Sequence, residues 1–365
     1  MQRIYLFLLL MCLQLSLPAQ QQPLRIGVIG LTHTHVHWIL GRADRGDIKI
    51  VGIVEPNREL AERYAKQHGY SMNILFSSMD EMIAVTRPEA VTAFGTIYEH
   101  LKVVETAAPK GIHVMVEKPL AVSMEHAQKM EVLAKKYNIH LLTNYETTWY
   151  PSNKKVNELL QNGTVGSLRK VVVRDGHRGP KRIGINKEFL DWLTDPVQNG
   201  GGALMDFGCY GANLVTWLQH GKRPTSVTAV THQLQEENNP DVDDEATIIL
   251  NYDTAQAIIQ ASWNWPIGRK DMEVYGLTGA LYADNRTAVR WRKAEGYDGY
   301  KEEAYQLKEN EKPFDDPFAL FAAVIRKKVV LKPYDLSSLE NNMLVVEILQ
   351  AASESAKTGR TVKLN

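Results

Sequence analysis

Between residues 24 and 144, short β-rich runs alternate with segments that have helical spacing. Strands and helices that alternate in this way form a parallel, doubly wound sheet. After about residue 150, strand-like runs follow one another with a single helix between them, over residues 203–219. Such runs are typical of antiparallel sheets. The sequence therefore predicts an α/β domain over residues 24–146. A second, α+β domain with an open, mostly antiparallel sheet is predicted over residues 147–365, with its last helix at 339–356.

The first residues have a different character from the rest. Arg3 precedes an apolar run of about ten residues, and the small residue Ala19 follows. A short positive region, an apolar core and a small residue predict a secretory signal peptide over residues 1–19. The apolar core is too short for a comfortable transmembrane helix, so we expect no stable membrane anchor. The predicted location is secreted or periplasmic. An apolar N-terminal strand is the alternative interpretation.

Charge and cysteine content limit the classes of function. The chain has 42 basic and 42 acidic residues, so it has no net formal charge and no basic stripe that would predict nucleic-acid binding. Once the signal peptide is removed, Cys209 is the one remaining cysteine, and no intrachain disulfide can form. The mature protein is therefore expected to depend on its hydrophobic cores for stability.

A charged pair follows a buried strand near the middle of the first domain. The apolar run 114–116 stops at Glu117, Lys118 and Pro119. Ligands of open α/β sheets bind outside the carboxyl ends of the strands, so Glu117 and Lys118 lie where chemistry is expected. Proline cannot donate to a strand ladder and therefore ends the strand. A surface charge pair would have the same sequence, and only the rest of the chain distinguishes the two.

The first strand and its turn resemble a dinucleotide-binding loop of the Rossmann type. The usual pattern is G-x-G-x-x-G, but here only Gly30 remains, and Thr32 and His35 occupy the other glycine positions. The following helix N-terminus still favours an anion, and we expect Thr32, His33 and Thr34 to face the pyrophosphate. Glu55 ends the second strand, 25 residues after Gly30. An acidic residue there binds the ribose hydroxyl and repels a 2′-phosphate, which predicts NAD rather than NADP.

Three histidines in this loop raise a metal-binding alternative. His33, His35 and His37 form an H-x-H-x-H pattern, and H-x-H after a strand also begins metal-dependent hydrolases built as barrels. A barrel needs eight strand–helix units, whereas this chain turns antiparallel after about residue 150. In a helix, His33 and His37 would share a face that His35 does not. We therefore predict no metal and interpret the loop as phosphate-facing.

Taken together, these motifs resemble the glucose–fructose oxidoreductase, inositol dehydrogenase and MocA (Gfo/Idh/MocA) family. The resemblance covers nearly all of the chain after the signal and rests on these matches: Gly27–Gly30, Glu55, Thr96–His100, Glu117–Pro119, Gly200–Tyr210 and Thr358–Val362. It implies a Rossmann domain joined to an open, mostly antiparallel sheet that often forms an oligomer interface. It also implies NAD-dependent chemistry on sugars, polyols and related small molecules, including redox-neutral glycoside cleavage in some members.

The resemblance also assigns roles to particular residues. Lys118 resembles the active-site lysine beside nicotinamide, and Asp206 and Tyr210 match an Asp-x-Gly-x-His/Tyr motif; these three are the predicted catalytic residues. With Asp206 and Tyr210 four residues apart, we expect one helix face to carry both, and we expect the Lys118 ammonium to favour ionisation of Tyr210. The predicted cofactor-binding residues are Gly30, Thr32, His33, Thr34, Glu55, Thr96, His100, Glu117 and Lys118.

Some residues depart from the family pattern or have an open role. Thr148 stands where many members carry arginine. Several aromatic residues could stack on a sugar or could equally be core residues: Trp149, Tyr150, Trp192, Trp263 and Trp265.

Two functions from different classes remain open on the sequence alone. The first is an NAD(H)-dependent oxidoreductase for a saccharide, polyol or glycoside, with redox-neutral glycoside cleavage as a variant. Because free NAD is expected to be scarce outside the cytoplasm, such an enzyme would keep its cofactor bound. The second is a non-catalytic sugar-binding protein, suggested by the glycines lost at Thr32 and His35. A homo-oligomer formed through the second sheet is expected in either case.

Overall fold

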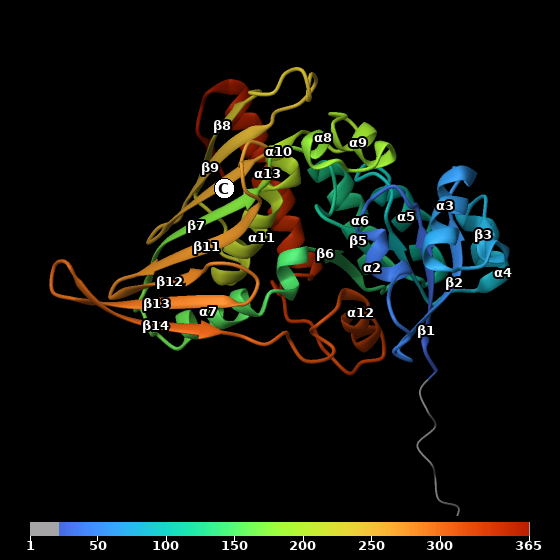
Figure 1. Cartoon of the computed structure of the whole chain (residues 1–365), viewed down its shortest axis with the longest axis horizontal. Coiled ribbons are helices and arrows are strands. Elements are labelled where there is room, and N and C mark those ends of the chain that lie inside the picture. Colours follow the sequence, from blue (N-terminus) through green and yellow to red (C-terminus); the bar gives the residue numbers. More distant parts are fainter. Residues whose placement is uncertain (1–21, 365) are drawn as a thin grey trace, which may run out of the picture.

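The computed structural model describes residues 22–364, so the predicted signal peptide lies outside the described residues. The chain forms two sheets that stand side by side, with helices packed on and between them (Figure 1). No helix in the described part combines the length and the apolar character that a membrane crossing requires.

The first sheet has six parallel strands in the order β3-β2-β1-β4-β5-β6, as predicted for the first domain. Its strands are β1 (Leu24–Ile29), β2 (Ile48–Val54), β3 (Leu75–Phe76), β4 (Ala90–Ala93), β5 (His113–Glu117) and β6 (Leu141–Asn144). Strand β4 is buried along its whole length and β5 from Val114 to Glu117, as expected for parallel strands that are covered on both faces. The helices between the strands are α2 (Val36–Leu40), α3 (Arg58–His68), α4 (Met79–Thr86), α5 (His100–Ala107) and α6 (Met124–Lys136).

The second sheet has nine strands in the order β14-β13-β12-β11-β7-β10-β9-β8-β15. They are β7 (Leu168–Gly176), β8 (Ser226–His232), β9 (Glu245–Asn251), β10 (Gln256–Ser262), β11 (Arg269–Gly276), β12 (Gly279–Ala283), β13 (Ala288–Glu295), β14 (Gly299–Gln306) and β15 (Val362–Lys363). Every neighbouring pair is antiparallel except β7 and β10, which run parallel. The predicted open, mostly antiparallel sheet is confirmed.

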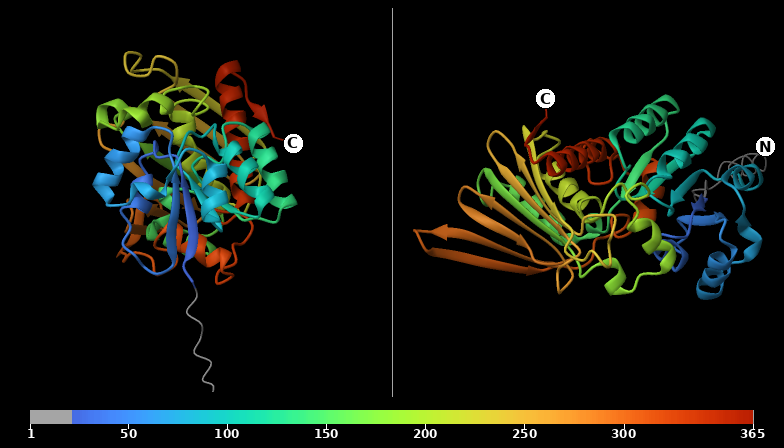
Figure 2. Two further views of the ribbon diagram at one scale, coloured as in Figure 1. Left: turned by 90° about the vertical axis from the view of Figure 1, so that its right-hand side faces the viewer. Right: turned by 90° about the horizontal axis from the view of Figure 1, so that it is seen from above.

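Helices cover one face of the second sheet (Figure 2). The inward row Val173, Ile259 and Ile248 is fully buried. Helix α11 (Gly208–Leu218) lies so close to β10 that a Cβ atom at Gly211 would come within 2.4 Å of Ile259. The other helices of this region are α7 (Pro151–Gln161), α8 (Pro180–Ile183), α9 (Lys187–Leu193), α10 (Ala203–Asp206), α12 (Pro317–Ile325) and α13 (Leu339–Thr358).

The C-terminal helices return to the first sheet, which the sequence pattern does not show. Phe318 and Phe321 of α12 belong to the same core as Leu24 and Ile26 of β1. Val346 of α13 belongs to the core on the other side of that sheet. The last helix extends two residues beyond its predicted end. Helices α12 and α13 therefore complete the hydrophobic cores on the two sides of the first sheet. The two domains are held together by this packing as well as by the covalent connections between them.

Candidate active site

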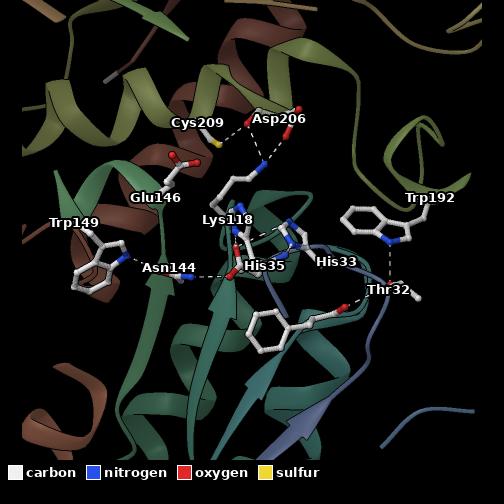
Figure 3. A network of polar contacts seen from close by, with 12 residues as sticks. Thr32, His33, His35, Lys118, Asn144, Glu146, Trp149, Trp192, Asp206 and Cys209 are labelled. Atoms are coloured by element: carbon white, nitrogen blue, oxygen red, sulfur yellow. Dashed lines mark hydrogen bonds and ion pairs between the residues drawn. The ribbon is translucent and has the colours of Figure 1, made fainter. Parts of the chain in front are cut away.

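The carboxyl edge of the parallel sheet holds a buried ion pair. Lys118 follows the last residue of β5, and its side chain reaches across to the second sheet's helices, where Nζ pairs with Asp206 Oδ1 (Figure 3). Nζ also donates to the Asp206 backbone oxygen at 3.2 Å, and the Trp263 indole N–H donates to Asp206 Oδ2 at 2.9 Å. Burial alone would lower the pKa of Lys118, but the Asp206 carboxylate outweighs it and raises that pKa. The site therefore presents an ammonium group held by a carboxylate.

The helix that carries Asp206 is interrupted, which corrects the expectation of one continuous helix over 203–219. Helix α10 ends at Asp206 and α11 begins at Gly208, so Asp206 and Tyr210 belong to two consecutive helices, although both lie near Lys118 as expected. The carbonyl of Asp206 accepts from the Lys118 ammonium and from the Cys209 thiol instead of continuing the helical ladder. These two donors occupy both lone pairs of the carbonyl, and the Tyr210 N–H bonds to the Phe207 carbonyl instead, at 3.2 Å.

Tyr210 is brought beside the ion pair by this break. Two ammonium groups lie near its ring, with Lys118 Nζ at 5.4 Å and Lys270 Nζ at 4.9 Å from the ring centroid. Burial and then the Glu146 carboxylate raise the pKa of the Tyr210 hydroxyl well above its usual value. The expectation that Lys118 favours ionisation of Tyr210 is therefore wrong, because Lys118 is already neutralised by Asp206. Tyr210 is a hydrogen-bond donor rather than a phenolate.

A second set of charged residues near Tyr210 was not predicted from the sequence. Glu146 follows β6, pairs with Lys270 of β11 and accepts from the Tyr150 hydroxyl at 2.5 Å. Asp175 of β7 is paired in register with Lys270 and is buried, and neither of its carboxyl oxygens has a hydrogen-bond partner within residues 22–364. Burial raises the pKa of Asp175 well above its usual value. Glu146 could have been found from its place after a parallel strand, but Lys270 and Asp175 meet only through sheet pairing.

Glu117, the last residue of β5, connects the loop after β1 with β6. Its Oε2 lies 2.9 Å from His35 Nδ1, and its Oε1 accepts from Asn144 Nδ2 at 2.7 Å. Trp149 in turn donates from its indole N–H to Asn144 Oδ1 at 3.0 Å (Figure 3). These contacts and the nearby His33 lower the pKa of Glu117 to about 2 against the effect of burial. Glu117 therefore fixes the orientation of the loop after β1 relative to β5 and β6.

The tryptophans considered for sugar stacking have other roles. Trp263 is fully buried and holds Asp206, so its interpretation as a stacking surface is wrong. Trp149 is buried behind Asn144, and Trp192 lies against the loop after β1. Trp265 packs beside the Arg269 guanidinium, 4.9 Å from it.

A cavity of about 430 Å³ opens at the carboxyl edge beside β1, β2 and β4. Five of the predicted cofactor-binding residues line it: Gly30, Thr32, Glu55, Thr96 and His100. The other four lie outside its lining: His33, Thr34, Glu117 and Lys118. His33 is buried against Phe189, with 4.5 Å between the ring centroids, and the expectation that it lines the nucleotide cavity is not met.

The floor and rim of this cavity suit a dinucleotide. Gly30 has a φ of +75°, and a Cβ atom there would lie 2.6 Å from the backbone nitrogen of Gly95. Only glycine fits this close approach of two loops. Glu55 accepts from the backbone N–H groups of Leu31 and Asn57, each at 2.8 Å, and lines the same cavity. His100 donates from Nδ1 to the Leu120 carbonyl at 3.1 Å, and its other ring nitrogen has no partner in the described chain.

His33, His35 and Glu117 form a cluster that could be mistaken for a metal site. Their ligand atoms lie within 4.8 Å of one another. His33 Nδ1 accepts from the His35 backbone N–H at 3.1 Å, so the ring proton of a neutral His33 is on Nε2, the atom that faces Glu117. A metal ligand needs a free lone pair there, with the other nitrogen donating. The hydrogen bonds of His33 and His35 therefore favour a role in holding the loop after β1 in place over metal coordination.

Comparison with known families and proteins gives matches over both parts of the chain. Residues 24–145 match the model described as "Oxidoreductase family, NAD-binding Rossmann fold". Residues 153–282 match the model of the GFO/IDH/MocA C-terminal domain.

The curated relatives are similar over part of their length. The trans-1,2-dihydrobenzene-1,2-diol dehydrogenase of Xenopus tropicalis is 27% identical over 220 residues, which are 59% of this chain and 61% of the relative. The 1,5-anhydro-D-fructose reductase of Ensifer adhaerens is 23% identical over 57% of this chain and 60% of the relative.

Solved structures are similar over nearly the whole chain. An aldose–aldose oxidoreductase of Caulobacter crescentus, complexed with glycerol, has a TM-score of 0.77 at 22% identity and covers 94% of this chain and 100% of its own. An inositol dehydrogenase homologue of Azotobacter vinelandii, complexed with NAD+, has a TM-score of 0.80 at 16% identity and covers 94% and 98%. At these identities the likeness establishes the fold.

Proposed function

Because this chain belongs to the Gfo/Idh/MocA family of NAD-binding oxidoreductases, we propose that it transfers a hydride between bound NAD and a carbinol carbon of a saccharide, polyol or glycoside. The observation that carries this proposal is the buried Lys118–Asp206 pair with Tyr210 beside it. The three groups lie at the carboxyl edge of the sheet whose cavity suits a dinucleotide. A non-catalytic binding protein would not need a buried ion pair at this position.

The described residues fit NAD on two structural grounds. Gly30 and Gly95 leave a close-packed floor that a Cβ atom would fill, and His100 has an unpartnered buried nitrogen. Glu55 and Thr96 would hold the ribose end, and the loop at Thr32 would lie along the phosphates. When bound, NAD supplies the site that accepts or returns the hydride.

The side chains then supply proton transfer and orientation. Lys118, as an ammonium, donates a proton to the substrate oxygen when a carbonyl is reduced, and its amine accepts that proton in the reverse direction. Asp206 orients Lys118 and keeps it charged. The Tyr210 hydroxyl donates a hydrogen bond to the same oxygen, because its pKa is raised and it stays protonated.

The substrate class is inferred from the relatives and from the polar wall of the site. The related proteins are named for dihydrodiols, anhydrofructose, aldoses and inositol, all of which are polyhydroxylated. In this chain Glu146, Lys270 and Asp175 provide acceptors and donors for further hydroxyl groups beside Tyr210. We propose that the enzyme is exported through the N-terminal signal, that it keeps its cofactor through turnover, and that a second sugar or a redox-neutral cycle regenerates it.

The test begins with the purified protein and no added nucleotide. Denaturation should release NAD(H) into the supernatant, which chromatography identifies. Candidate aldoses, inositols and glycosides are then mixed with the NAD+-loaded protein, and reduction of the bound nicotinamide is read by absorbance in a single turnover. Lys118→Met should bind NAD and show a rate about 10²–10⁴-fold lower. If the protein neither contains nor binds NAD(H), the oxidoreductase proposal is wrong and a sugar-binding role takes its place.

A further inference from the structure

The segment between β7 and α10 crosses from the second sheet to the nucleotide-binding side of the first. It carries the short helices α8 and α9, which Figure 1 shows reaching from the nine-stranded sheet over the first domain. No helix was predicted for this segment from the sequence. Around α9, it contacts the loop after β1, the loop after β4 and helix α3 of the first domain.

The central contact is made by Trp192 of α9. Its indole N–H donates to Thr32 Oγ1 at 3.0 Å, in the loop after β1 (Figure 3). Trp192 also lines the cavity together with Gly30, Glu55 and Thr96. Its side chain is 6% exposed, so nearly the whole indole is packed against protein. A buried tryptophan contributes roughly 150–250 Å² of contact, which makes it the main anchor of α9.

Further contacts surround this anchor on three elements of the first domain. Phe189 packs on the His33 ring, with 4.5 Å between centroids. Asn186, the N-cap of α9, donates to the Tyr64 hydroxyl on α3 at 2.6 Å. The Tyr98 backbone N–H, after β4, donates to the Gln198 carbonyl at 3.0 Å. The more exposed Glu188–Arg63 ion pair adds little, as is usual at a surface.

We propose that α9 is the outer wall of the NAD pocket and that it retains the dinucleotide between turnovers. This inference rests on the proposed function, since it concerns the same cofactor. With α9 in place, Trp192 and Thr32 join the two domains at the edge of the cavity. The nucleotide leaves only after the Trp192–Thr32 bond and the Phe189–His33 contact separate. The second domain thus supplies the residues that retain the nucleotide. In the loop after β1, Thr32 accepts the hydrogen bond from Trp192, which a glycine at this position could not do.

The test measures cofactor release without any substrate. Protein loaded with NADH is mixed with excess NAD+, and the loss of NADH fluorescence gives the dissociation rate. Trp192→Phe and Thr32→Val each remove one neutral hydrogen bond, worth about 0.5–1.5 kcal/mol, so each should speed release about 2- to 12-fold. The double variant should be no faster than the faster single variant, because both changes remove the same bond. Trp192→Ala should release NADH at least tenfold faster than the wild type.

The matched control is Asp191→Ala, on the same helix but paired with Lys187 and more than half exposed. It should release NADH at the wild-type rate. As an independent measurement on the unaltered protein, amide hydrogen exchange should show that NADH slows exchange in α9. If NADH binds but Trp192→Phe and Thr32→Val release it at the wild-type rate, or if α9 gains no protection, the inference about α9 fails while the proposed function stands. If the wild type does not bind NADH, both fail.

Discussion

At the scale of single residues, the site works by pairing each charge with a specific partner. Lys118 is held by Asp206, and Lys270 is held by Glu146, so that the two ammonium groups beside Tyr210 are both neutralised. This pairing determines the protonation states of Lys118 and Tyr210, on which the proposed proton transfer depends. It keeps Lys118 charged in spite of burial, and it leaves Tyr210 without a free cation that would ionise it.

Asp206→Asn is expected to change the pH dependence of catalysis as well as its rate. The carboxylate raises the pKa of Lys118, whereas burial lowers it, so the variant should have a lower Lys118 pKa. The free amine needed for alcohol oxidation then forms at lower pH, and the alkaline rise of the oxidation rate should move to lower pH. The rate itself should also fall as the lysine loses its orientation, by no more than the about 10²–10⁴-fold that a proton-transfer group contributes. Single-turnover absorbance, recorded across pH, measures both the rate and its pH dependence. The surface control Asp191→Asn should behave like the wild type. If the pH–rate profile of Asp206→Asn is also unchanged, the role given to Asp206 is wrong.

Glu55→Gln is expected to weaken the preference for NADH over NADPH. One carboxylate oxygen of Glu55 accepts from Leu31 and the other from Asn57, so the single amide oxygen of glutamine can keep only one of these bonds, and both nucleotides should bind more weakly than to the wild type. Loss of the negative charge removes the repulsion of a 2′-phosphate. Fluorescence titration should show that the ratio of the NADPH dissociation constant to the NADH dissociation constant falls about tenfold. Glu59→Gln, exposed on the first turn of α3, should leave the ratio unchanged, and a wild type that prefers NADPH would contradict the assignment.

At the scale of elements, close approach of backbones shapes the site more than regular secondary structure does. The loop after β1 meets the loop after β4 at Gly30 and Gly95, with no room for a side chain. Helix α11 meets β10 at Gly211 in the same way. The break between α10 and α11 then turns Asp206 toward Lys118 and Tyr210 toward Lys270.

Gly30→Ala is expected to disrupt the loop after β1. Alanine would need a left-handed φ and would place its Cβ 2.6 Å from the Gly95 nitrogen. Strain and overpacking of this kind typically cost about 1–3 kcal/mol each. Urea unfolding should show a loss of that size, with NADH binding weakened at least tenfold. Gly268→Ala is the control, because its nearest neighbours lie 3.8 Å from the added atom. A Gly30→Ala protein with wild-type stability and affinity would show that the loop can widen freely.

At the scale of the whole molecule, the two faces of the second sheet differ. The inner face carries the core and the active-site groups, whereas the outer face of the described chain has no helix packed on it (Figure 2). An apolar row runs across that face, in which the partly exposed Ile258 lies between the partly exposed Ile249 and the buried Val172 on the two neighbouring strands. Such a row suits burial against another copy of the chain, as the family resemblance leads us to expect.

Ile258→Asp should therefore dissociate the predicted homo-oligomer. A carboxylate at the centre of the apolar row would have to be buried without a partner, which is costly. Sedimentation velocity should give an oligomer for the wild type and a protomer for the variant at micromolar concentration. Val85→Asp, on the exposed surface of α4, should sediment like the wild type. A wild-type protomer at that concentration would exclude this interface as a stable one.

The pattern of apolar residues was sufficient to predict most strands and helices of the first domain, because alternating strands and helices have only one common way to pack. The same pattern located the carboxyl edge of the sheet, since parallel strands all end on the same side, and it placed Gly30, Glu55 and Lys118 at that edge. The family motif added Asp206 and Tyr210. Sequence spacing failed where backbone hydrogen bonds were diverted, as at the Asp206 carbonyl, and so it predicted one helix where there are two.

Tertiary structure decided the partners of these residues. Lys270 reaches the site from β11, Asp175 from β7, and Trp263 from the residue after β10, and only the order of those strands places them together. Trp192 meets Thr32 across 160 positions of the chain. Burial then set the protonation states, because the cost of a charge depends on how much water remains beside it, and that depends on every element packed around the site. The sequence by itself therefore determined which groups stand at the edge of the first sheet, and packing between the domains determined the charge that each of them carries.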